Sequence, residues 1–361
     1  MAVYQIDGYT LTLDLVDQIL KDPKARVELS EEARARCEKS RAQVDRWLVE
    51  GAPAVYGVNT GLGSLKDVAV PAQKHIEWNK RLPYPHAAGF DEYLPPEITR
   101  LALLLRANVL ARGYSAVRPA LIQRLLDLVN AGVAPAVRGH GSTGLSDLGP
   151  LSQCVMTVVG MEDASAFYQG ELMTARQALK KAGLEETFTL ACKEVLAQMN
   201  GSTMTQAIAV STYLQLRPML PACFELFGGE RAQALRETVD WVGAILEREN
   251  NITCDNPLLF ETEDGEYEAV MGCNCSNTQV GYAMDLLSVV VAEAGKRALA
   301  KYPQPILWQR LATLAMQVSG DSIPTKGGQE DHVEFSYTAA EKAAESVAVL
   351  QSLLDCHTAR A

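Results

Sequence analysis

Positive charge is scarce in this sequence of 361 residues. Its 33 lysine and arginine residues stand against 44 aspartate and glutamate residues, which gives a net charge of −11. Binding to a nucleic-acid backbone requires clustered lysine and arginine side chains. We therefore predict that the chain has no nucleic-acid partner.

Long hydrophobic runs are also absent. The most apolar stretch, Met284 to Ala292, is interrupted by Asp285 and followed by Glu293, so it is unsuited to crossing a bilayer. The first residues have no basic flank and include early acidic residues, which is unlike a signal peptide. We expect a cytoplasmic protein with no membrane partner.

Histidine is limited to five residues, and the eight cysteines are scattered along the chain. A metal site needs several such ligands at matched spacing, so we predict none. Without a secretion signal we expect reduced thiols. Cys273 and Cys275 are the one close pair, and two interpretations stay open for them: buried structural thiols, or a nucleophile beside a positive neighbour.

Strand patterns are few and short, whereas helical periodicity covers most of the chain. Strands are predicted over 4–7 and, as a hairpin, over 260–269. Helices are predicted over 30–51, 95–113, 119–132, 150–161, from residue 200 or 202 onward, and over 232–249, 279–300, 305–319 and 334–357. Pro218 should kink the helix that contains it.

Several of these helices are apolar on more than one side, which is typical of helices buried in a bundle or a subunit interface. No internal repeat or low-complexity linker divides the chain. We therefore predict a mainly α fold, a bundle of long helices with few short strands. It should form one domain over 1–361, with a loop-rich part over 1–149 and a central helical bundle over 150–361.

Three loops carry the densest polar and glycine content. Tyr56–Gly63 has three glycines, and Pro83–Gly89 places His86 between prolines and small residues. Glycine-rich loops are costly in backbone entropy, so they indicate function unless they are mobile surface connections. The third, Gly141–Pro150, precedes a helix whose free N–H groups favour negative charge. Its residues are therefore candidates for holding an anion or an enolate-like oxygen.

Taken together, these segments resemble the histidine/phenylalanine/tyrosine ammonia-lyase superfamily. The matching segments, in family order, are Tyr56–Gly63, His86–Gly89, Leu103–Pro119, Gly141–Leu151, Asn200–Gly201, Thr253–Pro257, Met271–Gln279 and Asp321–His332. So many motifs in one order indicate homology rather than a chance match. The resemblance implies a central bundle of long, nearly parallel helices. It also implies a homotetramer in which several subunits build each active site.

One departure concerns the electrophile of the family. Family members form a methylidene-imidazolone from an internal Ala-Ser-Gly: the nitrogen of the third residue closes the ring, and the serine then loses water. Here the triplet is Leu145-Ser146-Asp147, and the loop is one residue shorter. The third position needs glycine because the cramped backbone does not accept a Cβ. We therefore expect no methylidene-imidazolone and no other cofactor.

Two further departures concern the substrate. The family segment with a tyrosine, and with the arginine that holds the substrate carboxylate, has no counterpart between residues 216 and 252. The family's Asn-Phe-His-Gly step is replaced by a segment that begins Asn274-Cys-Ser. The sequence offers other cations for the carboxylate without ranking them, namely Arg81, Arg138 and Lys326.

The resemblance implies three catalytic candidates. Tyr56 matches the residue that moves the proton beside the departing amine, and Glu330 matches an acid that moves protons near that amine. A free phenol has a pKa near 10, so Tyr56 needs positive partners or aimed N–H groups to act at neutral pH. Ser146 is the third candidate, although no histidine partner is evident in sequence. A satisfied tyrosine hydroxyl and an ion-paired or capping Glu330 are the structural alternatives.

The same resemblance implies a set of substrate-binding residues: Leu62, Gly63, His86, Asp147, Asn200 and Asn274. Asparagine amides are able to polarise a carbonyl, but they also cap helices and brace loops. A loop histidine such as His86 is equally consistent with a purely structural hydrogen bond.

The favoured hypothesis is a ring-free enzyme that performs acid–base elimination, addition, isomerisation or cyclisation on a small organic substrate. One alternative is a histidine or aromatic amino-acid ammonia lyase, or an aminomutase, with an atypical electrophile built from Leu145-Ser146-Asp147. The other is a non-catalytic relative that binds a ligand or pairs with an active homologue.

Overall fold

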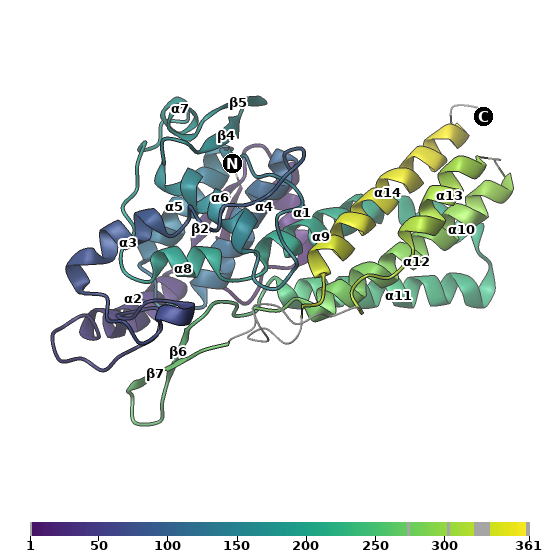
Figure 1. The fold of residues 1–361 in the computed structure, drawn as a ribbon. Helices are drawn as coiled ribbons and strands as arrows, with labels where there is room; N and C mark the ends of the chain where they lie inside the picture. Colours follow the sequence, from purple (N-terminus) through teal and green to yellow (C-terminus); the bar gives the residue numbers. More distant parts are fainter. Residues whose placement is uncertain (1, 273–274, 302–303, 321–332, 359–361) are drawn as a thin grey trace. The chain divides into compact units, whose positions relative to one another are not determined.

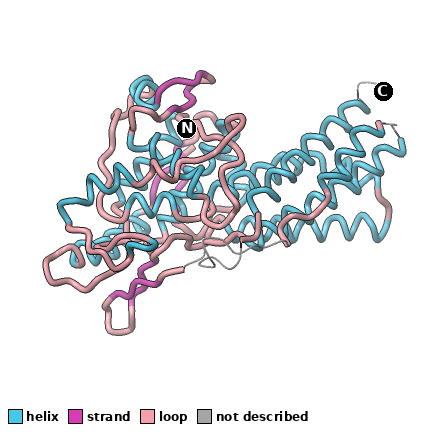
Figure 2. The backbone as a smooth tube through the Cα atoms, viewed as in Figure 1, coloured by secondary structure: helices cyan, strands magenta, loops and turns pink. Residues whose placement is uncertain are grey.

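The computed structural model describes residues 2–272, 275–301, 304–320 and 333–358 (Figure 1). Helices make up most of these residues and strands are short, which confirms the predicted mainly α fold (Figure 2). The described residues belong to two compact units, which comprise Met1–Ser142, Ser146–Met204 and Asn250–Cys275, and Thr143–Leu145, Thr205–Glu249 and Ser276–Ala361. Whether the chain is one domain, divided at residue 149, stays a prediction.

The first unit is built around α4 (Pro96–Ala111), which is buried on nearly every side. Helices α5 (Pro119–Ala131) and α2 (Glu31–Arg46) pack on it, and α6 (Leu148–Val159) contacts α8 (Glu194–Met199). The smaller helices of this unit are α1 (Leu13–Lys21), α3 (His75–Arg81) and α7 (Ala175–Lys181). Because α4 is buried on nearly every side, it serves as the core that its neighbours share.

Three small sheets complete the first unit. Strand β1 (Val3–Ile6) pairs in parallel with β2 (Arg26–Leu29). Strands β3 (Ala134–Pro135), β4 (Ser165–Tyr168) and β5 (Glu171–Thr174) form an antiparallel sheet. The hairpin of β6 (Leu258–Glu261) and β7 (Tyr267–Val270) confirms the predicted one.

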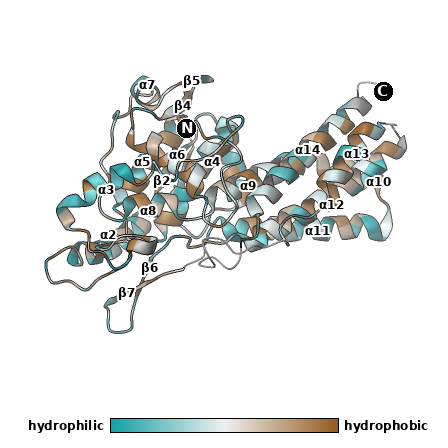
Figure 3. Ribbon diagram, viewed as in Figure 1, coloured by the Kyte–Doolittle hydropathy of each residue, from teal (hydrophilic) through white to brown (hydrophobic). Residues whose placement is uncertain are grey.

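The second unit is built from helices and loops, with no strand among its described residues. Helix α12 (Thr278–Lys301) packs against α14 (Ser336–Thr358), α13 (Pro305–Leu314) and α11 (Gly229–Glu249). Hydrophobic residues recur along the ribbon of these helices (Figure 3). On α12 the buried stripe consists of Val280, Met284, Leu287 and Val291. This spacing places all four on one helix face, so it explains the close packing in the unit.

A buried acid also links elements of the second unit. Asp285 of α12 accepts a hydrogen bond from Lys342 Nζ at 2.8 Å and others from Ser319 N and Oγ at 2.8 and 2.6 Å. Burial alone would raise the pKa of Asp285, but these hydrogen bonds outweigh it and hold the pKa below its usual value. The residue that interrupts the most apolar stretch of the sequence is therefore satisfied inside the unit.

The predicted kink at Pro218 is confirmed as a 3₁₀ turn (Arg217–Met219) between α9 (Thr203–Leu216) and α10 (Leu220–Leu226). Several predicted bounds were wrong. Helix α2 ends at Arg46 rather than at 51, α6 begins at Leu148, ahead of Pro150, α11 begins at Gly229 rather than at 232, and α13 ends at Leu314 rather than at 319. Pattern reasoning also missed a set of short elements: α1, α3, α7, α8 and β2 to β5.

Glycine ends α6 at a crowded position. Gly160 has φ +71°, and an added Cβ would lie 1.8 Å from the Glu186 carbonyl oxygen. Gly160→Ala should lower the free energy of unfolding by about 3 kcal/mol, the left-handed penalty plus a steric one. Gly132→Ala is the matched control, because Gly132 has φ +74° but open space. It should cost about 1 kcal/mol in urea denaturation. Equal losses in the two variants would contradict the steric explanation.

Candidate active site

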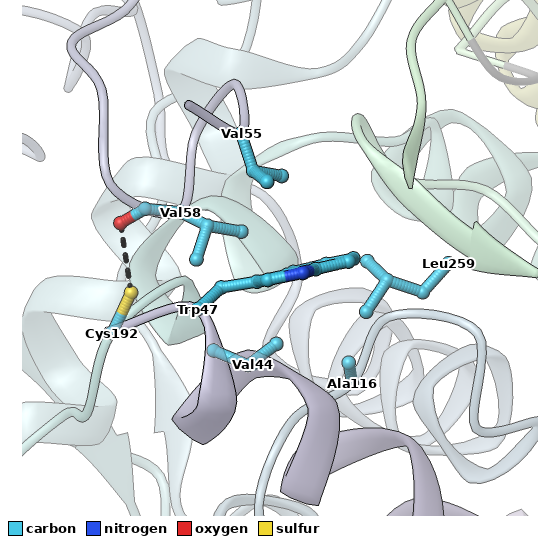
Figure 4. Close-up of a cluster of buried hydrophobic side chains, with 7 residues drawn as sticks. All are labelled: Val44, Trp47, Val55, Val58, Ala116, Cys192 and Leu259. Carbon is cyan, nitrogen blue, oxygen red and sulfur yellow. Dashed lines mark hydrogen bonds between the residues drawn. The ribbon is translucent and has the colours of Figure 1, made fainter. Parts of the chain in front are cut away.

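The loop that carries Tyr56 is anchored by buried residues on both sides of the tyrosine (Figure 4). Val55 and Val58 belong to a cluster with Trp47 and Cys192. The Cys192 thiol donates a hydrogen bond to the Val58 carbonyl oxygen at 3.1 Å. Burial raises the pKa of Cys192 to about 12, so this thiol is protonated and structural. The cluster therefore fixes the path of the chain through Tyr56.

Tyr56 itself is half-buried. Its Oη accepts a hydrogen bond from the Gly63 N–H at 3.4 Å, across a turn that contains the half-buried Leu62. An N–H group aimed at this oxygen stabilises negative charge there. The structure thus brings Tyr56 and Gly63 together, and their catalytic and binding roles stay predictions.

Gly57 places this loop against two other segments. It has φ +69°, and an added Cβ would lie 2.9 Å from Leu196 Cδ1 and 3.1 Å from Pro257 Cδ. Only glycine accepts both the conformation and the close approach. The Tyr56 loop therefore packs on α8 and on the segment that precedes β6.

Ser146 is held at three points. It has φ +54°, and its N–H donates to the Cys275 carbonyl oxygen at 2.8 Å. Its hydroxyl accepts a hydrogen bond from the Gly201 N–H at 3.0 Å and donates to Asn200 Oδ1 at 3.4 Å. The predicted residues Ser146 and Asn200 therefore lie side by side, with the Ser146 oxygen oriented by a backbone amide.

The Asn200 amide is oriented by a residue that sequence reasoning did not select. Asn200 Nδ2 donates to the Asn256 carbonyl oxygen at 3.2 Å, which turns Asn200 Oδ1 toward Ser146. Asn256 Oδ1 in turn accepts from the Gly272 N–H at 3.0 Å. The sequence does point to Asn256, because this residue lies in the Thr253–Pro257 motif.

Asp147 is fully buried and immediately precedes α6. Its N–H donates to the Gly201 carbonyl oxygen at 2.8 Å, and its Oδ1 accepts from Ser142 Oγ at 2.7 Å. An anion bound at the start of α6 would therefore face a buried carboxylate. The substrate-binding role of Asp147 stays a prediction.

His86 lies in a loop beside Gly141. Its Nδ1 is 2.9 Å from the Leu82 carbonyl oxygen. A carbonyl only accepts, so Nδ1 carries a proton. An added Cβ on Gly141 would lie 2.7 Å from the Ala88 carbonyl oxygen, which shows how closely the two loops approach.

The remaining predicted residues either lie outside the described residues or make exposed contacts of their own. Glu330 and Asn274 lie outside the described residues, as do Cys273 and Lys326. Arg81 is exposed and pairs with Glu77 at 2.7 Å. The exposed Arg138 donates to the Asp91 carbonyl oxygen at 2.8 Å and lies over the Tyr93 ring. Either arginine would have to give up these contacts to bind a carboxylate.

Within the described ranges, no group of three or more histidine, cysteine, aspartate and glutamate side chains is arranged to hold a metal ion. In the same ranges, no helix is both long and apolar enough to cross a membrane. Five of the described cysteines are buried free thiols: Cys37, Cys154, Cys192, Cys223 and Cys254.

A model of the aromatic amino acid lyase family matches residues 11–224 and 230–301. The chain is 31% identical to the histidine ammonia-lyase of Geobacillus sp. (strain WCH70), over 96% of this chain and 84% of that relative. It is 32% identical to the histidine ammonia-lyase of Myxococcus xanthus, over 93% and 83%. The crystal structure of histidine ammonia-lyase from Trypanosoma cruzi superposes with a TM-score of 0.85, at 26% identity, covering 98% of this chain and 82% of that one.

The fold and these similarities define a lyase-type enzyme with a mainly α architecture. The chain belongs to the aromatic amino acid lyase family. The tyrosine aminomutase from Streptomyces globisporus shares the fold, with a TM-score of 0.87 at 21% identity, over 98% of this chain and 86% of that one. The Geobacillus alignment spans 440 positions, well beyond the 361 residues here, so that relative has segments that this chain lacks.

Proposed function

We propose that this chain is a lyase that works without a methylidene-imidazolone, through acid–base chemistry of Tyr56 on a small organic substrate. One observation supports this most strongly. Asp147, a buried residue with a side chain, occupies the ring-closing position, and its N–H is already committed to the Gly201 carbonyl oxygen at 2.8 Å.

The residues present fit the ring poorly. Closure joins the Asp147 nitrogen to the Leu145 carbonyl carbon, so the nitrogen loses its hydrogen and the bond to Gly201 with it. The Asp147 side chain would have to move while it is fully buried and bonded to Ser142. Loss of water from Ser146 would also remove the hydroxyl that bonds Asn200 and Gly201. Each change leaves a polar group without its partner, which is costly away from water.

The side chains that remain suit proton abstraction beside a carbonyl. In this proposal the Tyr56 phenolate accepts the proton, and Gly63 N–H stabilises the oxygen before the transfer. The electron pair left on carbon either expels a group from the next carbon, which is elimination, or takes up a proton elsewhere, which is isomerisation. His86 Nε2 and the Ser146 hydroxyl supply hydrogen-bonding groups for the substrate.

A second candidate is an ammonia lyase or aminomutase acting on an amino acid. It is favoured by the histidine ammonia-lyases among the relatives. It needs an atypical electrophile formed from Leu145-Ser146-Asp147. The two candidates differ in the covalent state of the chain, because forming the electrophile removes two molecules of water.

Intact-mass spectrometry separates these candidates. We expect the purified wild-type chain to have the mass calculated from its sequence, and Ser146→Ala to differ from it only by the lost oxygen atom. A wild-type mass lower by two waters, absent from Ser146→Ala, would establish the second candidate instead. Ammonia release from L-histidine, L-tyrosine and L-phenylalanine should be assayed on the same samples, since these are the amino acids of the family.

We also propose that the enzyme is a cytoplasmic homotetramer. An exposed apolar stripe on α12 supports self-association: Tyr282, Leu286 and Val289 are 46%, 39% and 47% exposed on one face of the helix. Leu286→Lys should shift the mass measured by light scattering toward smaller species. Met316→Lys, at a solvent-exposed site on the same unit, is the control and should leave it unchanged. If both variants remained tetrameric, the stripe would not be the subunit interface.

A further inference from the structure

A buried ion pair is linked to the Ser146 site through Asn256 and Asn200. Lys193 Nζ is 2.5 Å from Asp255 Oδ2, and both side chains are 0% exposed. Removing two charges from water is so costly that apolar replacements of such pairs are often no less stable. Stability alone therefore gives little reason for this pair.

The backbone of Lys193 carries a second cost. Lys193 has φ +69°, a left-handed conformation that side chains with a Cβ rarely adopt, and it immediately precedes α8. A strained residue that also buries a charge points to a function served by its exact placement rather than to stability.

A path of hydrogen bonds that runs through the backbone of Asn256 joins the pair to the site. Asp255 Oδ1 accepts from the Asn256 N–H at 2.7 Å, and the Asn256 carbonyl oxygen accepts from Asn200 Nδ2 at 3.2 Å. Asn200 Oδ1 accepts from Ser146 Oγ at 3.4 Å. Asp255 therefore restrains the Asn256 backbone, whose carbonyl oxygen orients the Asn200 amide.

We propose that Lys193 and Asp255 are positioning residues, whose ion pair restrains the backbone of Asn256 and, through it, the Asn200 amide and the Ser146 hydroxyl. The inference rests on the proposed function, because it takes Ser146 and Asn200 as parts of the site. Without the pair, the Asn256 backbone loses this restraint, Asn200 is less well oriented, and the Ser146 hydroxyl loses its fixed acceptor.

The test removes both charges at once, so that no uncompensated ion is left in the interior. Lys193→Met/Asp255→Leu is compared with Arg118→Met/Glu194→Leu. Glu194 of the control pair follows Lys193 in the sequence and is also fully buried, but it bonds Arg118 and the Ala191 N–H rather than Asn256. Both variants are first checked for cooperative unfolding.

Hydrogen–deuterium exchange of peptides that cover 141–151 and 200–204 gives the primary readout. The amides of Ser146, Asp147 and Gly201 are all bonded within the network. We expect at least tenfold faster exchange there in Lys193→Met/Asp255→Leu and wild-type exchange in the control. Wild-type exchange in both variants, or equal acceleration in both, would overturn the inference.

Steady-state kinetics supply a second readout. They are measured with whichever of L-histidine, L-tyrosine and L-phenylalanine the wild type converts. A positioning role predicts that kcat falls at least tenfold while KM changes less, because the substituted residues are not themselves substrate contacts and the His86 contact remains. Wild-type kcat in a variant with accelerated exchange would overturn the inference. A wild-type mass lower by two waters refutes the ring-free proposal separately, because intact mass reports the covalent state of the chain and does not depend on amide exchange.

Discussion

Replacing Tyr56 with phenylalanine is expected to lower kcat by roughly 10²–10⁴-fold, the usual contribution of a positioned general acid or base. The substitution removes only the hydroxyl oxygen. The ring that remains fills the same half-buried space, and Val55 and Val58 still anchor the loop on both sides. Steady-state kinetics on the amino-acid panel measure the effect. Thermal denaturation should show an unchanged midpoint.

Tyr84→Phe is the matched control for this prediction. Tyr84 belongs to the neighbouring loop, is exposed, and donates a hydrogen bond to Asp163 at 3.2 Å. Removing its hydroxyl should leave kcat within about twofold of wild type, since surface substitutions rarely have large effects. Wild-type turnover in Tyr56→Phe would show that Tyr56 does not transfer the proton, and Glu330 and Ser146 would remain as the catalytic candidates.

The long helices were predictable because their ends are marked locally. Ser30 caps α2 by accepting the Ala33 N–H at 3.2 Å, and Pro119 occupies the first turn of α5. Gly132 and Gly160 end their helices in left-handed conformations. Such signals act within one turn, so a sequence pattern contains them in full.

The short elements were not predictable because distant residues determine them. Strand β2 is four residues long, and it exists because β1 lies beside it and Asn130 Oδ1 accepts the Val27 N–H at 2.8 Å. Neither contact leaves a periodic pattern in four residues. Helix α8 likewise depends on partners that its own six residues do not reveal.

The candidate site was likewise only partly predictable from the sequence. Motif resemblance identified Tyr56, Ser146 and Asn200, but it did not show that the Ser146 hydroxyl bonds Asn200. Asn256 was visible only as part of a motif, and the Lys193 charge gave no sign that its partner lies 62 residues away. Partner choice between distant polar groups is a property of the packed chain, not of local spacing.

A buried arginine should have the largest effect on stability. Arg106 of α4 is buried, and its guanidinium donates to the carbonyl oxygens of Ala197, Cys254 and Asn200. Arg106→Met keeps most of the volume and leaves these acceptors without a donor. At about 1–3 kcal/mol for each unsatisfied group, partly offset by removing a buried charge, the free energy of unfolding should fall by about 3–5 kcal/mol.

Two comparisons decide whether the hydrogen bonds of Arg106 cause that loss. Arg106→Lys keeps the charge, but its single ammonium group does not reproduce the planar fork that reaches three carbonyls, so it should lose nearly as much stability as Arg106→Met. Arg26→Met removes an arginine that is 53% exposed and pairs with Glu28, and it should cost less than about 1 kcal/mol. Urea denaturation followed by circular dichroism measures all three. If Arg106→Lys retained wild-type stability, charge alone would matter at this position, and the fork geometry would not hold α8 to the segment at Cys254.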